Sequence, residues 1–65
     1  MLNIAELRVR HGKMSQKELA EKIGTTQTSI SLWEKDIESI SAPYLIKVCK
    51  FFGVSSDELL GLRDG

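Results

Sequence analysis

Apolar residues recur along the 65-residue chain at the spacing of helices rather than with the strict alternation of strands. The first predicted helix opens after Asn3 and ends near His11, where Gly12 interrupts the pattern. The second opens after Ser15, which has a glutamate three residues further on, and it ends at Gly24, a residue suited to a left-handed helix end. The first part of the chain therefore predicts two short helices with marked boundaries.

The pattern continues into three further helices. Thr26 is the predicted N-cap of a third helix that runs to about Lys35, and the polar loop DIES follows it. Ser41 is the predicted cap of a fourth helix that ends at Gly53, and Ser55 precedes a short fifth one. The chain thus predicts an all-α fold of five helices. Helical periodicity turns the following residues inward: Ile4, Leu7, Leu19, Ala20, Ile23, Ile30, Trp33, Leu45, Val48, Cys49, Phe52, Leu59 and Leu60.

Length and charge narrow the class of protein. A chain of this size is expected to form one small domain over residues 1–65, with room for a single core. Nine Lys/Arg balance nine Asp/Glu, but residues 1–35 hold six basic against four acidic residues, whereas residues 36–65 hold three against five. Any face that binds an anion is therefore expected in the first half.

Cysteine content and hydropathy bear on the compartment. Cys49 is the single cysteine, so it has no partner for an internal disulfide, and a small domain from an oxidising compartment would usually have several. No apolar run in the sequence reaches the length of a membrane span, and the N-terminus lacks the pattern of a signal peptide. We therefore expect a cytoplasmic protein without a membrane partner.

The second and third helices, with the glycine turn between them, match a helix-turn-helix motif over residues 16–35. With Ile30 and Trp33 turned inward, the outward face of the third helix carries amide, hydroxyl and aliphatic groups. The side-chain amide of a glutamine can pair with adenine, and methyl groups can contact thymine in the major groove of double-stranded DNA. The residues predicted to contact bases are Gln27, Thr28, Ser31 and Leu32.

A second set of residues surrounds this face and is predicted to contact phosphate. At the start of the second helix, outward backbone amides and the helix dipole favour an anion beside Gln16 and Lys17. Phosphate contacts fix the register in which bases are read. The full predicted set is Gln16, Lys17, Lys13, Thr25, Thr26, Ser29 and Lys35.

The chain resembles the lambda-repressor-like helix-turn-helix family, also called the Cro/C1 or XRE type, over nearly its whole length. The resemblance lies in LR at 7–8, SQKELAEKIG at 15–24, TTQTSISLWE at 25–34 and FFGVSSDELL at 51–60. It implies a compact five-helix DNA-binding domain that binds operator DNA as a homodimer, with Gln16 at the backbone and Gln27 at adenine. It also implies a structural ion pair between Arg8 and Glu34, whose loss is expected to cost roughly 3 to 5 kcal/mol if the pair is enclosed.

The chain departs from the pattern of the family in three places. An extra residue, Lys13, lies before the second helix, Asp36 replaces the usual glycine after the third helix, and Ile40 replaces the usual proline of the next loop. That loop also carries Glu38 and no basic residue. We therefore expect little phosphate affinity from the loop and a shallow dependence of DNA binding on salt.

The last third of the chain holds apolar residues beyond those of the predicted core. Exposed together they would favour self-association, so they are the predicted dimer interface; alternatively, some of them cover the bottom of the core. These residues are Ile46, Phe51, Val54 and Leu62.

No residue set suggests catalysis. With His11 as the single histidine, no nucleophile-base pair or metal-ligand cluster can be assembled, and no glycine-rich phosphate loop is present. We therefore expect no enzyme activity, no cofactor, no metal and no small-molecule ligand. The sequence favours a transcriptional repressor that binds a pseudo-palindromic operator as a homodimer. The alternative is a protein-interaction module, such as an antitoxin or an adaptor, that has kept the fold and binds DNA weakly.

Overall fold

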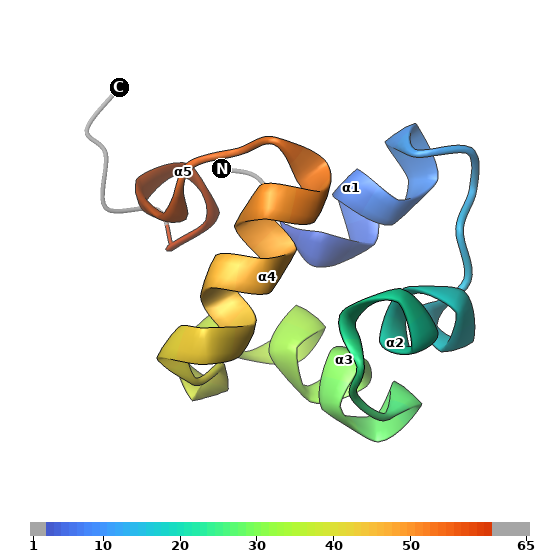
Figure 1. Ribbon diagram of the computed structural model, residues 1–65, viewed down its shortest axis with the longest axis horizontal. Coiled ribbons are helices and arrows are strands. Elements are labelled where there is room, and N and C mark those ends of the chain that lie inside the picture. Colours follow the sequence, from blue (N-terminus) through green and yellow to red (C-terminus); the bar gives the residue numbers. More distant parts are fainter. Residues whose placement is uncertain (1–2, 61–65) are drawn as a thin grey trace.

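A computed structural model describes residues 3–60, and within this range the chain is helical and contains no strand (Figure 1). The all-α prediction is confirmed. The elements are α1 (Ile4–Arg10), α2 (Gln16–Ile23), α3 (Gln27–Lys35), the 3₁₀ helix η1 (Ile37–Ser39), α4 (Ala42–Phe52) and α5 (Ser56–Leu60).

Side-chain caps explain where most of these helices begin. The Asn3 side chain accepts a hydrogen bond from the Glu6 amide at 2.9 Å. Ser15 and Glu18 form a reciprocal capping box, with distances of 3.0 and 3.2 Å. The prediction for Ser41 was wrong in this respect: it occupies the N-cap position of α4, but its side chain makes no capping hydrogen bond.

Two helices end where the sequence predicts, because glycine adopts the left-handed backbone at their ends. Gly24 follows α2 with a φ of 86°, and Gly53 follows α4 with a φ of 70°. The extra residue Lys13 is also left-handed, with a φ of 58°, and its amide donates to the Val9 carbonyl at 3.0 Å. The insertion therefore folds into the turn after α1.

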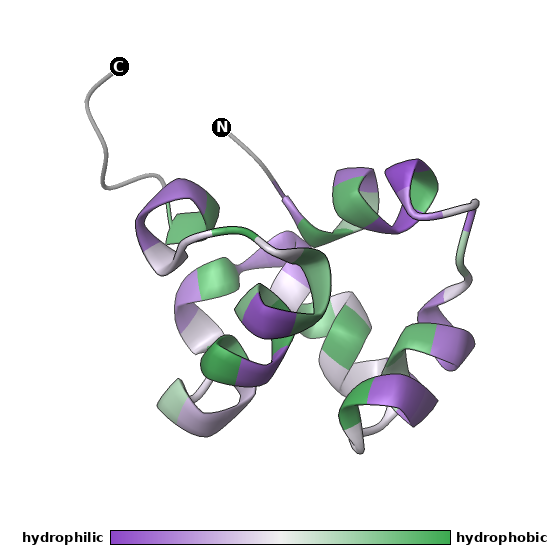
Figure 2. Cartoon of the chain, turned by 45° about the horizontal axis from the view of Figure 1, so that its top comes forward, coloured by the Kyte–Doolittle hydropathy of each residue, from purple (hydrophilic) through white to green (hydrophobic). Residues whose placement is uncertain are grey.

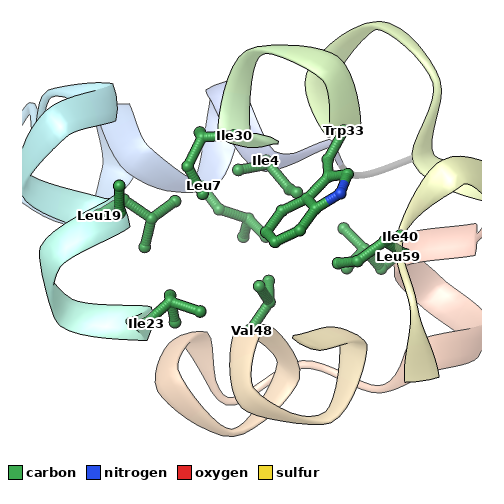
Figure 3. Packing of buried hydrophobic residues seen from close by; sticks show 10 residues of the cluster. Ile4, Leu7, Leu19, Ile23, Ile30, Trp33, Ile40, Val48 and Leu59 are labelled. Atoms are coloured by element: carbon green, nitrogen blue, oxygen red, sulfur yellow. The ribbon is translucent and has the colours of Figure 1, made fainter. Parts of the chain in front are cut away.

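The core lies where the inner faces of all five α-helices meet (Figure 3). Ile30 and Trp33 project into it from α3, opposite Val48 of α4. The buried residues are Ile4, Leu7, Leu19, Ala20, Ile23, Ile30, Trp33, Ile40, Val48 and Leu59. Four residues predicted to be in the core are only half-buried, namely Leu45, Cys49, Phe52 and Leu60. Hydrophobic and hydrophilic residues alternate along the helices, as expected for helices with one face in the core (Figure 2).

The segment after α3 differs from the predicted polar loop. It forms η1, in which the Asp36 side chain accepts from the Glu38 amide at 3.2 Å and the Ile40 amide donates to the Ile37 carbonyl at 3.1 Å. Ile40 is buried and Ile37 packs against the core. The segment was predicted to be a polar loop, but Ile37 and Ile40 cover the end of the core beside α5.

The packing of the helices leaves one side of α3 uncovered. α3 contacts α1, α2 and η1, while α4 contacts α2 and α5 (Figure 1). The Tyr44 hydroxyl of α4 donates to the Gly24 carbonyl at 3.4 Å, and its ring lies 5.3 Å from that of Trp33. α4 therefore supports the α2–α3 pair from behind. Across residues 3–60, none of the helices has both the length and the apolar character that crossing a membrane requires.

Candidate nucleic-acid interface

The two faces of α3 have opposite character. Ile30 is 0% exposed and Trp33 is 5% exposed, so the apolar side of the helix is fixed in the core. On the other side, Gln27 and Thr28 are exposed and Leu32 is 51% exposed. Because a helix is narrow enough to enter the DNA major groove, an outward face of this kind can reach base edges.

The outward face forms one side of an open groove with a volume of about 420 Å³. The four residues predicted to contact bases all line it, and they are joined by one residue from α2 and by the last residue of α3. The lining residues are Gln16, Gln27, Thr28, Ser31, Leu32 and Lys35. The structure therefore brings the predicted base-contacting set together on a single surface, and their contacts with DNA stay predictions.

The turn before α3 holds the first residues of the helix in place. The Thr26 hydroxyl accepts from the Ser29 amide at 3.1 Å and lies 3.0 Å from the Ser29 hydroxyl. The Gly24 and Thr25 amides both donate to the Ala20 carbonyl, at 2.8 and 2.9 Å. Hydrogen bonds at the end of α2 and at the start of α3 therefore fix the position of Gln27, the first residue of α3.

Of the residues predicted to contact phosphate, Gln16 and Lys35 line this groove. The whole set comes from the loop before α2, the start of α2, the turn and both ends of α3. Lys13, Lys17, Thr26 and Lys35 are exposed, whereas Gln16, Thr25 and Ser29 are half-buried. The acidic residues Asp36 and Glu38 are exposed directly after α3, so the cations of this face border an acidic segment.

Arg8 and Glu34 form the ion pair that the resemblance implies. Arg8 Nε lies 2.6 Å and Arg8 Nη2 lies 3.1 Å from the two carboxylate oxygens of Glu34, which is a bidentate contact. Their side chains are only 16% and 12% exposed. Arg8 Nη1 also donates to the Met14 carbonyl at 2.8 Å, so the guanidinium ties α1, the following loop and α3 together.

Gln16 belongs to the same network, which the sequence reasoning missed. Its Nε2 donates to Glu34 Oε1 at 2.8 Å, so one amide hydrogen points to the carboxylate rather than to solvent. The other amide hydrogen and the carbonyl oxygen are left for the groove that Gln16 shares with Gln27. No local signal could have revealed this contact, because Gln16 and Glu34 are 18 positions apart.

The residues predicted to form a dimer interface are not equivalent. Ile46 is 54% exposed, whereas Phe51 and Val54 are half-buried and pack against the core. The alternative reading, in which some of these residues cover the core, therefore describes Phe51 and Val54. Leu62 lies outside the described residues.

Two titratable side chains lie away from the α3 face. His11 caps the end of α1, and its ring lies 5.1 Å from that of Phe51 and 5.7 Å from that of Phe52. Cys49 is half-buried, and its pKa is raised above the ordinary value of 9.0 by burial and, to a smaller degree, by the negative charge of Glu58. Within residues 3–60, no three metal-binding side chains cluster.

The uncovered face of α3 and the glycine turn between α2 and α3 are the features of a helix-turn-helix DNA-binding domain. The part-buried Arg8–Glu34 pair fixes α3 against α1. A family model described as helix-turn-helix matches residues 4–59. The chain belongs to this Cro/C1-type, XRE family, whose members are DNA-binding regulators and typically not enzymes. Neither curated proteins nor solved structures gave a match to the chain.

Proposed function

We propose that the protein is a sequence-specific transcriptional repressor that binds a pseudo-palindromic operator as a homodimer. The observation that carries this proposal is the pair of opposed faces of α3. Ile30 and Trp33 fix the helix from behind, and the amide and hydroxyl side chains remain accessible in an open groove. A duplex can approach this face without any rearrangement of the core.

Each residue of the outward face has a chemical role in the proposal. Gln27, at the first position of α3, donates to N7 of adenine and accepts from its N6 amine, which discriminates against other bases by about 1 to 3 kcal/mol. The methyl group of Thr28 and the side chain of Leu32 contact thymine methyl groups. Ser31 supplies a hydroxyl that can donate or accept. The face therefore favours a half-site that contains A·T pairs.

The surrounding polar groups anchor the sugar-phosphate backbone in this proposal. Lys13, Lys17 and Lys35 supply positive charge. The Ser29 hydroxyl oxygen already accepts a hydrogen bond from the Thr26 hydroxyl, so the hydrogen of Ser29 is available to donate to phosphate. Thr25 and the second amide hydrogen of Gln16 complete the contacts. With three lysines at phosphate, the logarithm of affinity should fall with the logarithm of salt concentration with a slope of roughly −3 per protomer.

The proposed dimer contact is centred on Ile46. Among the members of the predicted interface that lie within residues 3–60, Ile46 is the strongly exposed one, whereas Phe51 and Val54 already pack against their own core. A two-fold arrangement would place two recognition helices about 34 Å apart, one turn of DNA. Operator half-sites should then be separated by the same interval.

Sequence selection from a random pool of duplex DNA tests the proposal. We expect enrichment of an inverted repeat with A·T pairs in each half-site and a centre-to-centre spacing of one helical turn. Enrichment of a single half-site would contradict binding as a homodimer, but it would still support sequence-specific recognition of bases. A pool that stays random after repeated rounds, with equal weak affinity for all sequences, would contradict sequence-specific binding itself.

A second candidate function is a protein-interaction module that binds DNA weakly. The acidic segment after α3 favours it, because Asp36 and Glu38 are exposed next to the proposed DNA face and would repel phosphate. Salt separates the two functions: binding anchored by the three lysines weakens as salt rises, even without a contribution from the acidic loop, whereas an apolar protein contact changes little.

A further inference from the structure

A second groove lies on another part of the surface, between the end of α2 and the second half of α4. It is open, has a volume of about 450 Å³ and is lined by Lys22, Ile23, Lys47, Lys50 and Phe51. Lys47, Lys50 and Phe51 share one flank of α4, because residues three and four apart on a helix are neighbours. The groove contains no residue of α3 and none of the residues proposed to contact DNA.

The charge of this groove is one-sided in a chain whose net charge is zero. Its lining holds three lysines and no acidic residue. Within residues 3–60, the ion pairs are Arg8–Glu34 and Glu6–Arg10, so Lys22, Lys47 and Lys50 have no carboxylate partner there. Lys47 Nζ lies 5.3 Å from the centre of the Tyr44 ring, which holds this cation beside the groove.

The apolar part of the groove is fixed in position. The Phe51 ring lies 5.1 Å from His11 and 5.1 Å from Phe52, so its orientation is set by two other rings. Ile23 is 5% exposed and contributes the floor. The site therefore combines a rigid apolar centre with a rim of positive charge, which is the arrangement of an interface with an apolar core and a polar rim.

We propose that this groove binds an acidic peptide segment of a partner protein, with an aliphatic or aromatic side chain on Phe51 and Ile23 and carboxylates at the three lysines. Charge complementarity selects this occupant. A two-fold contact between two copies through the same groove would bring lysines of both copies together, which is repulsive. Because no residue of the groove belongs to the proposed DNA face, a bound peptide leaves that face uncovered.

The test is a titration of the isotope-labelled protein with a short fluorescent peptide of alternating glutamate and leucine. We expect shifts of the backbone amide signals of Lys22, Lys47, Lys50 and Phe51, and saturable binding by fluorescence anisotropy. Lys22→Gln and Lys50→Gln should each lower the affinity for the peptide by about 1.4- to 5-fold, which corresponds to the loss of one exposed ion pair. Lys17→Gln is the matched control and should leave peptide affinity unchanged.

Three further probes complete the experiment. A peptide with glutamine in place of glutamate should lose binding, and one with serine in place of leucine should bind more weakly, since the first lacks the charge and the second the apolar anchor. The proposal is overturned if Lys22→Gln and Lys50→Gln bind the peptide normally or if the shifts fall elsewhere. It is also overturned if the peptide leaves these signals in place and a single-stranded oligothymidine shifts them. The same holds if the peptide leaves them in place and they shift when the protein is concentrated, which would indicate self-association.

The same variants separate this proposal from the proposed DNA binding. Lys22→Gln should retain the operator affinity of the unmodified protein, because Lys22 belongs neither to the proposed DNA face nor to the proposed dimer contact, whereas Lys17→Gln should lose part of that affinity. Failure of the peptide to bind would leave the operator measurements intact, and failure of operator selection would leave the peptide measurements intact.

Discussion

The part of the molecule that presents α3 is fixed by more kinds of contact than α4 is. Side chains of Asn3, Ser15 and Thr26 cap the first three helices, and the Arg8–Glu34 pair joins α1 to α3. α4, by contrast, begins without a side-chain cap, and a single residue of that helix, Val48, is fully buried. The first region also holds seven of the ten buried apolar residues, so directional hydrogen bonds and apolar packing act together there. In the second region, Ser55 caps the short α5, whereas α4 depends mainly on apolar packing.

The largest effect should follow from breaking the part-buried Arg8–Glu34 ion pair of the first region. Glu34→Gln leaves the Arg8 guanidinium largely enclosed without a counter-charge, and removing one partner of such a pair costs about 3 kcal/mol. For a domain of this size, that loss corresponds to a melting temperature lower by roughly 12 to 24 °C. Thermal unfolding followed by circular dichroism measures it.

The control is the exposed pair between Glu6 and Arg10, whose atoms are 3.3 Å apart. Their side chains are 47% and 66% exposed, so solvent screens the interaction, and Glu6→Gln should cost about 0.5 kcal/mol or less. Equal losses in the free energy of unfolding for Glu34→Gln and Glu6→Gln would show that the Arg8–Glu34 pair does not fix α3.

The second prediction concerns the proposed contacts of the α3 face. Gln27→Ala should lower discrimination at one base pair of each half-site by about 1 to 3 kcal/mol, because the bidentate contact with adenine is lost. Lys17→Ala should weaken binding to all sequences equally and make the salt dependence shallower by about one unit of slope per protomer. Affinities for a panel of single-base operator variants, measured at several salt concentrations, distinguish these two outcomes. If neither substitution changes any affinity, DNA does not dock on this face.

Local chemistry explains how far the sequence predicts the fold. Caps, glycine helix ends and apolar spacing depend on residues within a few positions of each other, so helix bounds such as Gln16–Ile23 and Gln27–Lys35 follow from the sequence. The two faces of α3 follow from the spacing of Ile30 and Trp33 for the same reason.

Contacts between distant segments could not be predicted in this way. The hydrogen bond from Gln16 to Glu34 and the packing of His11 on Phe51 both join elements whose distance in space depends on the whole fold. Ile37 and Ile40 lie in a segment that was predicted to be a polar loop, and they pack on the core only because the end of the core beside α5 is open to them. Among the contacts between distant segments, the Arg8–Glu34 ion pair was expected beforehand, through the resemblance.

The third prediction compares the N-caps of the two regions. Thr26→Ala removes the hydroxyl that accepts from the Ser29 amide, which should cost about 1 kcal/mol. Ser41→Ala removes a side chain that makes no capping hydrogen bond, so its effect on stability should lie within about 0.5 kcal/mol. Urea unfolding of both variants measures the difference, and a loss at Ser41 as large as that at Thr26 would contradict the contrast drawn between α3 and α4.

The smallest effect concerns Cys49, which lies in the apolar second region. Burial, and to a smaller degree the charge of Glu58, raises the pKa of its thiol above 9.0, so at pH 8 it should react with iodoacetamide more slowly than a free cysteine does. Because the pKa is higher in the folded state, the stabilisation linked to the neutral thiol is complete below pH 9 and is lost as the pH rises through the raised value.

Glu58→Gln separates the two causes of this shift. The variant removes the negative charge and keeps an oxygen that can accept from Ser55, as Glu58 Oε1 does at 3.1 Å from the Ser55 hydroxyl. The pKa of Cys49 should fall, because the charge that helps to raise it is gone, and the alkylation rate at pH 8 should rise. Unfolding with denaturant should raise the rate further, because it also removes the effect of burial. A rate that is unchanged in Glu58→Gln and rises only on unfolding would assign the whole shift to burial between α4 and α5.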